Sequence, residues 1–318
     1  MTRLRFLILV LAVAALAVVA VDLSGRRVSL PDAFTSESVW NTPIPADAPV
    51  HPRSADIVAF LASDNILDGC ITLAGIGNKW GLPIYLADDA SPEYDVVSSK
   101  YEVPSEFSSL RIPRDALPAD NSDGEMIVYD LARGYVAHLS KASYDSAGDR
   151  WTVTGGSISY LASNGLDGSL PESDEPRNGG SFRGYNGAVA AVHYDDIAEG
   201  TLDNVVKIGV NNSHIDSVWP MIGSDGDLET SDAPLQGMRL RIRPDLNLES
   251  LGLEPQALVI ARGLQEYGAI IGDSTGGSIV LTLEDMDRAG TGGQWELDKR
   301  ALCTISATDF QIIDNPDG

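Results

Sequence analysis

Several features that define common protein classes are scarce in this sequence of 318 residues. It contains two cysteines and four histidines, and neither a Cys-x-x-Cys nor a His-Glu-x-x-His motif, so the usual signatures of zinc sites are missing. It has no glycine-rich loop of the kind that cradles phosphate, which removes the usual signature of nucleotide enzymes. It also has no internal repeat and no low-complexity tract.

Basic residues are scarce as well. The chain has 22 of them, only five of which are lysine, against 46 acidic residues, and its net charge is −24. A negative field of this size repels phosphate backbones and anionic membrane surfaces, so we exclude nucleic acid as a partner. An Asp-rich, Lys-poor surface resembles proteins adapted to high salt. The alternative is an ordinary acidic secreted protein, and the two differ in whether the fold needs molar salt.

Long apolar runs are absent after residue 21. Before that point Arg3 and Arg5 precede sixteen apolar residues, Phe6 to Val21, which close with small residues around Ala20. This pattern predicts a signal peptide over residues 1–21, followed by a single large β-rich domain over residues 22–318 that works outside the cytoplasm or at the cell surface. An uncleaved anchor is the alternative, because the run is just short of the roughly 17–25 residues that span a bilayer.

The two cysteines, Cys70 and Cys303, lie near opposite ends of the chain that would remain after cleavage. In an oxidising compartment they can join the first and last strands, and the alternative is two separately buried thiols.

Short runs typical of strands alternate with Gly, Pro, Asn and Asp. The alternation of Met238, Leu240 and Ile242 with three arginines predicts a half-buried strand with one cationic face. Helices are expected at residues 54–62 and 255–267, the second with a proline in its first turn and a glycine at its end. We therefore expect a mainly β fold of the β-sandwich or jelly-roll type, with two or three short helices packed on the sheet. The remaining expected strands are residues 69–74, 82–87, 126–129, 135–139, 151–154, 157–161, 188–193 and 205–210, with a hairpin of 269–272 and 278–283.

Four long blocks carry a resemblance. They are SFRGYNGAVAAVHYDDIAEG (181–200), VWPMIGSDGD (218–227), PLQGMRLRIRPDLNL (234–248) and IARGLQEYGAIIGDSTG (260–276). Together with the segments 39–58 and 122–130, they resemble a family of secreted bacterial proteins, often actinobacterial, that is associated with polysaccharide processing. The resemblance implies a carbohydrate context and assigns no activity. Members of that family often carry His where this chain has Glu125.

Paired carboxylates are the first candidates for catalysis. A glycoside hydrolase needs one carboxylic acid and a second carboxylate that acts as nucleophile or base. Asp123 and Glu125 open an expected strand two residues apart, which directs both side chains to one face. Asp225 and Asp227 have the same spacing in a Gly-rich loop. In so acidic a chain such pairs also arise by chance on the surface.

Elimination from a uronic acid needs a base and a group that stabilises the developing charge. Arg183 and Tyr185 are of suitable types, and His214 lies beside Asp216, which can orient it. His138, His193 and Asn186 are further candidates for this chemistry. Trp80 and Trp219 can stack on sugar rings, although core packing is the competing role for each of these side chains.

A resident cofactor is not expected. Asp225, Asp227, Glu229 and Asp232 offer oxygen ligands that suit Ca²⁺, but their spacing lacks the glycine and terminal glutamate of a helix–loop–helix calcium site. The leading hypothesis is a secreted glycoside hydrolase acting on a polysaccharide, with catalytic candidates Asp123, Glu125, Arg183, His214 and Asp225. Its alternatives are a polysaccharide lyase with His and Tyr acid–base chemistry, and a non-catalytic carbohydrate-binding or cell-surface protein.

Overall fold

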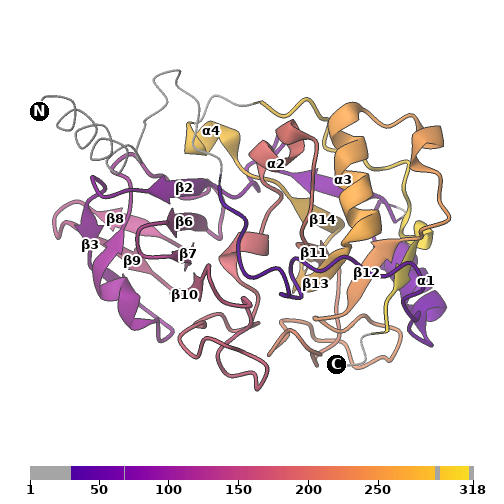
Figure 1. The fold of residues 1–318 in the computed structure, drawn as a ribbon, viewed down its shortest axis with the longest axis horizontal. Helices are drawn as coiled ribbons and strands as arrows, with labels where there is room; N and C mark the ends of the chain where they lie inside the picture. Colours follow the sequence, from indigo (N-terminus) through magenta and orange to yellow (C-terminus); the bar gives the residue numbers. More distant parts are fainter. Residues whose placement is uncertain (1–29, 68, 291–293, 315–318) are drawn as a thin grey trace, which may run out of the picture. The chain divides into compact units, whose positions relative to one another are not determined.

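The computed structural model describes residues 30–67, 69–290 and 294–314 (Figure 1). The predicted signal peptide over residues 1–21 lies outside this part of the chain. Within the described ranges, no helix combines the length and the apolar character needed to cross a bilayer.

The described residues form a mainly β structure in mixed sheets, with four short α-helices. This confirms the expectation of a sandwich-like β fold with a few helices on the sheets. The helices are α1 (Ser54–Asp64), α2 (Tyr194–Glu199), α3 (Pro255–Glu266) and α4 (Met286–Ala289), with 3-10 turns η1 (Ser105–Ser109), η2 (Gly187–Val189), η3 (Leu248–Leu251) and η4 (Ala307–Asp309). The strands are β1 (Ile71–Ala74), β2 (Ile84–Ala87), β3 (Glu93–Tyr94), β4 (Val96–Ser98), β5 (Leu110–Arg111), β6 (Met126–Asp130), β7 (Tyr135–Ser140), β8 (Ser143–Asp145), β9 (Arg150–Val153), β10 (Gly155–Tyr160), β11 (Val206–Val210), β12 (Arg239–Ile242), β13 (Ala269–Ser274), β14 (Ile279–Thr282) and β15 (Phe310–Ile312).

The larger sheet has six strands in the order β1-β14-β11-β13-β12-β15. β11 lies between β13 and β14, parallel to the first and antiparallel to the second. The predicted hairpin of β13 and β14 is therefore wrong. The reason is burial: all five residues of β11 are buried, so this strand needs a partner on each side, and the two chain-adjacent strands separate to enclose it.

The core of this sheet lies under α1 and α3. α3 packs on β12 and α1 on β15, and Figure 1 shows α3 running across the sheet. The buried stripe of α3 consists of Ala257, Ile260, Ala261 and Leu264, at the spacing of one helix face. Both helices were predicted from the sequence, and the structure confirms them.

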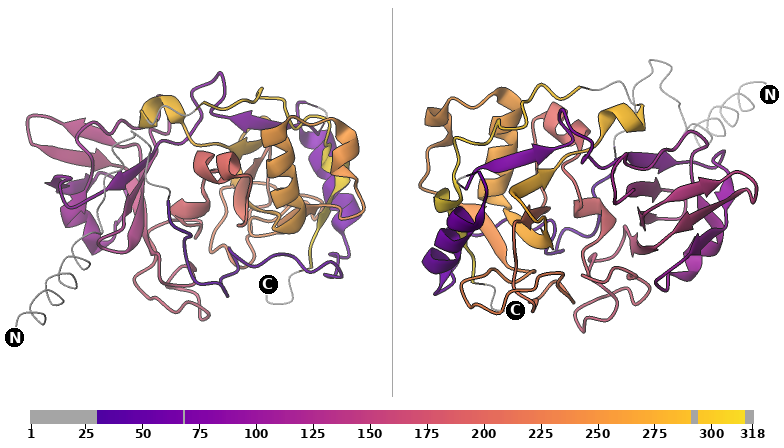
Figure 2. Two further views of the ribbon diagram at one scale, coloured as in Figure 1. Left: turned by 45° about the horizontal axis from the view of Figure 1, so that its top comes forward. Right: turned by 180° about the vertical axis from the view of Figure 1, so that it is seen from behind.

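The smaller sheet has four strands in the order β10-β7-β6-β2, and two further small sheets, β4-β9-β8 and β3-β5, accompany it (Figure 2). It has a hydrophobic core of its own around Phe107, Ile112 and Met126. The chain enters it directly from the larger sheet, because β2 follows β1 after nine residues. A methyl group on Gly81 would lie 2.8 Å from the Cα atom of Gly75, so this crossing requires glycine.

Two further strand predictions are wrong. Residues 188–193 do not form a named strand, because the Asn186 side chain accepts a hydrogen bond from the Val189 backbone N–H and starts the turn η2 instead. β12 is not half-buried, since all four of its residues are buried. The guanidinium of Arg241 donates to the Pro45 carbonyl, and that of Arg239 to Thr42, so the segment over residues 42–46 covers the cationic face.

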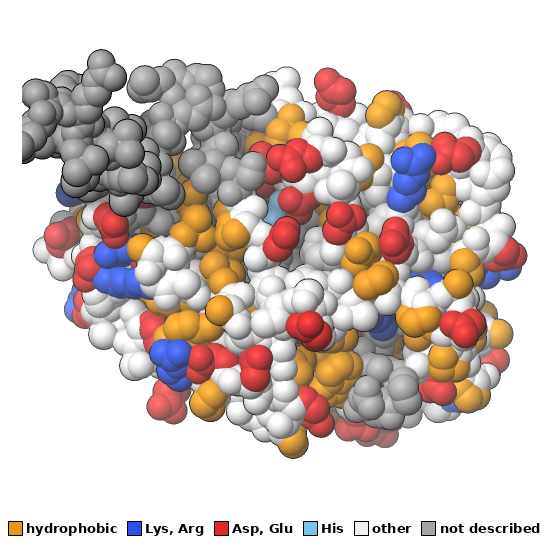
Figure 3. Space-filling view, in the orientation of Figure 1, with side chains coloured by type: hydrophobic (Ala, Val, Ile, Leu, Met, Phe, Trp, Pro, Cys, Tyr) orange, Lys and Arg blue, Asp and Glu red, His pale blue; other side chains and the backbone are white. Residues whose placement is uncertain are grey.

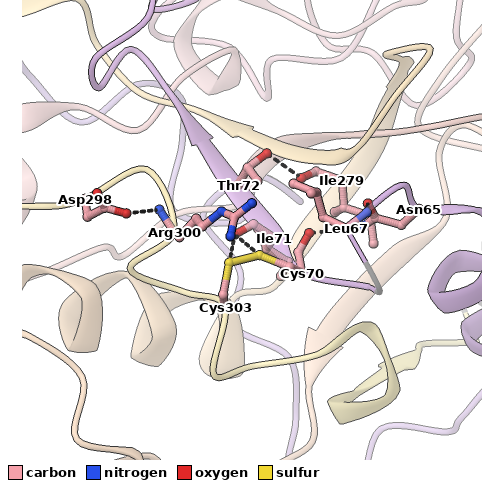
Figure 4. The surroundings of a disulfide bond; sticks show 9 residues. All are labelled: Asn65, Leu67, Cys70, Ile71, Thr72, Ile279, Asp298, Arg300 and Cys303. Atoms are coloured by element: carbon pink, nitrogen blue, oxygen red, sulfur yellow. Dashed lines mark hydrogen bonds between the residues drawn. A yellow bond between two sulfur atoms is a disulfide. The ribbon is translucent and has the colours of Figure 1, made fainter.

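Cys70 and Cys303 form a disulfide across 233 positions of sequence (Figure 4). Cys70 immediately precedes β1, and the Leu73 N–H of that strand donates to the Lys299 carbonyl at 2.9 Å. The bond and this contact attach the segment before β15 to the first strand of the larger sheet.

Candidate active site

Two hollows meet at a group of charged side chains. Hollow 1, of about 960 Å³, is lined by residues of β7, β10 and the loops over residues 101–106, 167–169 and 176–185. Hollow 2, of about 790 Å³, is lined by β1, β14, the segment 121–125 and Lys299 and Arg300. Side chains from the two linings contact one another, and we call this group the polar cluster. Those that line hollow 1 are His138, Arg183, Tyr185 and Asp225, and those that line hollow 2 are Glu125, Lys207 and Asp273.

Lys207 and Asp273 come from the two central strands of the larger sheet. Lys207 lies on β11 and only 7 % of it is exposed, while Asp273 lies near the end of the neighbouring β13. The Lys207 Nζ atom is 3.2 Å from Asp273 Oδ2, and the other oxygen of Asp273 accepts from Arg183. Burial opposes ionisation of Asp273, but Lys207 and Arg183 outweigh it and lower the pKa to about 2.

Asp225 connects this ion pair to the loop over residues 211–236. One of its carboxylate oxygens accepts from Arg183, and the other accepts from the Gln236 side chain and from the Ser274 N–H. Gln236 is fully buried and also donates to the Ser213 hydroxyl. Arg183 is thus held between two carboxylates, Asp225 and Asp273, which fixes its orientation.

Glu125 and His138 form the part of the cluster that belongs to the smaller sheet. His138 Nε2 is 3.1 Å from Glu125 Oε1, and the two side chains are 6 % and 27 % exposed. Burial acts to raise the pKa of Glu125, but the contact with His138 and the charge of Lys207 outweigh it and lower the pKa. Glu125 is therefore a carboxylate that orients the imidazole, with Nε2 as the N–H that donates to it.

Tyr185 lies between the two groups. Arg183 donates to the Tyr185 hydroxyl at 3.1 Å, the Lys207 Nζ atom is 4.9 Å from the ring centre, and the His138 ring centre is 5.9 Å away. Burial raises the pKa of Tyr185, and the nearby cations of Lys207 and Arg183 oppose this rise only in part. The phenol therefore keeps its proton at neutral pH.

Exposed aromatic side chains border the hollows on both sides of the polar cluster. Among the described residues, the Trp, Tyr and Phe residues with large exposed fractions are Trp80, Tyr101, Tyr144 and Phe182. Tyr101 and Phe182 line hollow 1, and Trp80 lines hollow 2. Three of these four rings thus lie where an elongated ligand crossing the cluster would meet them.

The structure brings together a majority of the predicted catalytic residues. Glu125, Arg183 and Asp225 belong to the polar cluster, and exposed Asp123 lines hollow 2 beside Glu125. Tyr185 and Trp80, predicted to bind substrate, also line the hollows.

The remaining predicted site residues lie outside both hollows. The His214 Nδ1 atom is 3.6 Å from Asp216, as the sequence suggested, but this pair does not line either hollow. His193 immediately precedes α2, and its ring packs edge-on against that of Tyr129. Asn186 caps η2, and Trp219 lies in the segment before β12.

The acidic residues considered for Ca²⁺ do not converge. Asp225 binds Arg183 and Gln236, whereas Asp232 pairs with Arg53. Within residues 30–67, 69–290 and 294–314, no three His, Cys, Asp or Glu side chains are grouped as metal ligands.

A Gly-x-Ser-x-Gly sequence, Gly272 to Gly276, also reaches hollow 2. In serine hydrolases this pattern forms a strand–turn–helix elbow that exposes the serine. Here the turn leads from β13 into strand β14, and the Ser274 hydroxyl is 2.7 Å from that of Ser213. The serine therefore acts in a hydrogen-bonded anchor of the loop that carries Asp225.

Lys207 and Asp273 were not among the predicted site residues. Their signal in the sequence is a charged residue inside or at the end of an otherwise apolar strand, in VVKIGV and AIIGD. A buried charge of this kind needs a partner, so each one points to the other once their strands are paired.

Comparisons of the chain with protein-family models, curated proteins and solved structures found no match. The functional argument therefore depends on the geometry of the polar cluster.

Proposed function

We propose that this chain is a secreted enzyme that cleaves an extracellular polysaccharide at the polar cluster, and that it does so by elimination from a uronic acid unit. The observation that carries the proposal is the contact of His138 with Glu125 beside a buried, protonated Tyr185, at the floor of a hollow bordered by exposed aromatic rings. Aromatic rings present flat apolar surfaces to sugar faces.

The acid–base roles follow from the contacts. With its Nε2 proton donated to Glu125, His138 has a lone pair on Nδ1 that accepts the proton from the sugar carbon next to the carboxylate. The electron pair of that C–H bond forms the carbon–carbon double bond, and the bond to the glycosidic oxygen breaks. The Tyr185 hydroxyl, which is 3.1 Å from Arg183, supplies the proton to the leaving oxygen.

The lowered pKa values of Glu125 and Asp273 argue against these two groups as the proton donor of a hydrolase. A hydrolase needs a carboxylic acid that keeps its proton near neutral pH, which requires a raised pKa. In the polar cluster the pKa of Glu125 is lowered and that of Asp273 is lowered to about 2. These two groups are therefore suited to orienting a base and holding cations, and not to donating a proton.

The test is to incubate purified protein with polygalacturonate, alginate and glucuronan, and with neutral glucan and xylan for comparison. Elimination is expected to yield unsaturated uronates, detected by ultraviolet absorbance, in step with new reducing ends. Reducing ends without absorbance would identify a hydrolase and overturn the assignment of elimination. Neither product from any glycan would favour the binding-only alternative.

Variants test the roles of the two rings. We expect His138→Gln and Tyr185→Phe each to lower the rate by about 10²–10⁴-fold, the range of general acid–base catalysis. His214→Gln and Tyr144→Phe are matched controls, because both residues lie outside the hollows. Equal losses in the controls would contradict the assignment.

A further inference from the structure

The two hollows differ in charge. Hollow 1 is lined by four carboxylates, Glu102, Glu106, Asp167 and Asp225, and by two arginines, Arg177 and Arg183. Hollow 2 is lined by Asp123, Glu125 and Asp273 and by Lys207, Lys299 and Arg300, so its charges balance. The whole chain has 46 acidic and 22 basic residues, and hollow 2 is therefore locally enriched in cations.

Two cations of hollow 2 are available to a ligand once ion pairs are removed. Asp273 is paired with Lys207, while Glu125 contacts His138, which the proposed mechanism uses as a neutral base. Lys299 and Arg300 are exposed and form no ion pair with a carboxylate of the described residues, which leaves these two cations beside the carboxylates of Asp123 and Glu125. Figure 3, which shows a single face of the protein, illustrates how sparse basic side chains are among acidic ones.

The disulfide attaches the segment that carries these two cations to β1. Cys303 lies three residues after Arg300 and is bonded to Cys70 at the start of β1. The Lys299 carbonyl accepts from Leu73 of β1, and Figure 4 shows Arg300 beside the disulfide and next to Thr72, which also lines hollow 2. Trp80, 47 % exposed, lines the same hollow.

We propose that hollow 2 is a subsite for a carboxylate-bearing sugar unit, in which Lys299 and Arg300 bind the carboxylate and Trp80 stacks on the ring. This inference rests on the proposed function and specifies its substrate class. It assigns roles to two cations that sequence patterns did not identify. Arg and Lys donate charge-assisted hydrogen bonds to carboxylates, which contribute more than neutral ones.

The net charge of −24 opposes the approach of a polyanion, so the proposal has a specific salt dependence. Long-range repulsion is screened as the Debye length falls from about 10 Å at 0.1 M salt to about 3 Å at 1 M. Contacts of the exposed Lys299 and Arg300 with a carboxylate are screened by the same salt. Lys299→Ala/Arg300→Ala is therefore expected to make tetragalacturonate binding rise more, or fall less, with added salt than binding by the wild type does.

The experiment measures binding of tetragalacturonate by calorimetry in a His138→Gln background, with cellotetraose as the neutral probe. We expect Lys299→Ala/Arg300→Ala to weaken tetragalacturonate binding by about tenfold or more and to leave cellotetraose binding unchanged. Arg114→Ala/Arg262→Ala is the control, because it removes the same charge from exposed positions outside the hollow. Equal effects of the two double variants, or equal loss for both probes, would overturn the subsite.

A second experiment removes the disulfide and keeps Lys299 and Arg300. The variant Cys70→Ser/Cys303→Ser, if folded by circular dichroism, is expected to weaken tetragalacturonate binding, because the segment with Lys299 and Arg300 is released from β1. Unchanged binding would contradict the role given to the disulfide. Cleavage that persists at wild-type efficiency in Lys299→Ala/Arg300→Ala would refute the subsite while leaving the proposed function intact. Binding of tetragalacturonate by the wild type without cleavage would refute the proposed function while leaving the subsite intact.

Discussion

Asp273 of the polar cluster and Asp196 of α2 have similar exposure and opposite acid–base behaviour. Their side chains are 31 % and 33 % exposed. In Asp273 the cations of Lys207 and Arg183 outweigh burial and lower the pKa to about 2. In Asp196 burial and the carboxylates of Asp195, Asp32, Glu199 and Asp203 raise the pKa to about 7. Neighbouring charge, and not the extent of burial, decides the sign.

The difference shows where this acidic chain places its few cations. Two of its 22 basic residues, Lys207 and Arg183, meet at one carboxylate of the polar cluster. At α2 several carboxylates gather instead. A second such arrangement, in which Arg111 and Arg133 both pair with Asp130, lies away from the polar cluster, so the few cations are gathered at particular carboxylates.

The largest expected effect comes from removing the compensating carboxylate. Asp273→Asn leaves Lys207 buried without its partner, and breaking a buried ion pair in this way costs about 3–5 kcal/mol. Chemical denaturation at pH 6 measures it. Asp245→Asn, at a side chain that is 76 % exposed, should change stability by less than about 0.5 kcal/mol. A similar small change for Asp273→Asn would show that the two regions do not differ as described.

A smaller effect is expected from the acidic group at α2, and it depends on pH. Because the folded pKa of Asp196 is raised to about 7, its contribution to stability is present below about pH 4 and is lost as pH rises through 7. Asp273, whose pKa is lowered to about 2, contributes above about pH 4 and loses that contribution as pH falls toward 2. Asp196→Asn should therefore abolish part of the stability loss that occurs as pH rises from about 4 through 7, which we call the alkaline loss. It should leave unchanged the stability loss that occurs as pH falls below about 4, the acid loss. Urea unfolding midpoints from pH 3 to 9 measure both. If the alkaline loss of stability were the same in Asp196→Asn as in the wild type, the result would argue against the role assigned to Asp196.

The smallest expected effect is that of salt on the stability contributions of the polar cluster and of the α2 carboxylates. Between 0.1 M and 1 M salt, repulsion among the α2 carboxylates is screened more than the ion pairs of the polar cluster, so the alkaline loss of stability should shrink while the acid loss persists. Thermal unfolding at pH 3, pH 5 and pH 9 over this range measures it, since the acid loss begins below about pH 4. The same scan tests whether the fold requires molar salt, the property that separates a salt-adapted protein from an ordinary acidic one. Identical salt dependence at all three pH values would count against the comparison.

Much of the fold was predictable because its elements carry local signals. α3 has a proline in its first turn and an apolar stripe, and the short apolar runs became strands β6, β7, β10 and β11. The pairing of β13 and β14 was not predictable, since a turn between two strands does not reveal that a third strand enters between them. The burial of the β12 arginines depends on a segment nearly 200 residues earlier in the chain.

The candidate site was predictable only in part, for a related reason. Arg183, Tyr185 and Asp225 lie in polar loops, where function concentrates, and were identified there. Lys207 and Asp273 lie in apolar strands that a pattern search treats as core. Lys299 and Arg300 carry no pattern, and reach hollow 2 because a disulfide attaches their segment to β1.

The sequence by itself determined the strand-rich composition of the fold and its acidity, because these depend on residue content and short-range periodicity. Tertiary structure alone decided that Lys207 and Arg183 meet at Asp273. At Asp273 the two cations that lower the pKa, Lys207 and Arg183, come from distant parts of the chain, and no local pattern records that they meet there. At Asp196 burial raises the pKa first, and its acidic neighbours are mostly close in the sequence, with only Asp32 distant.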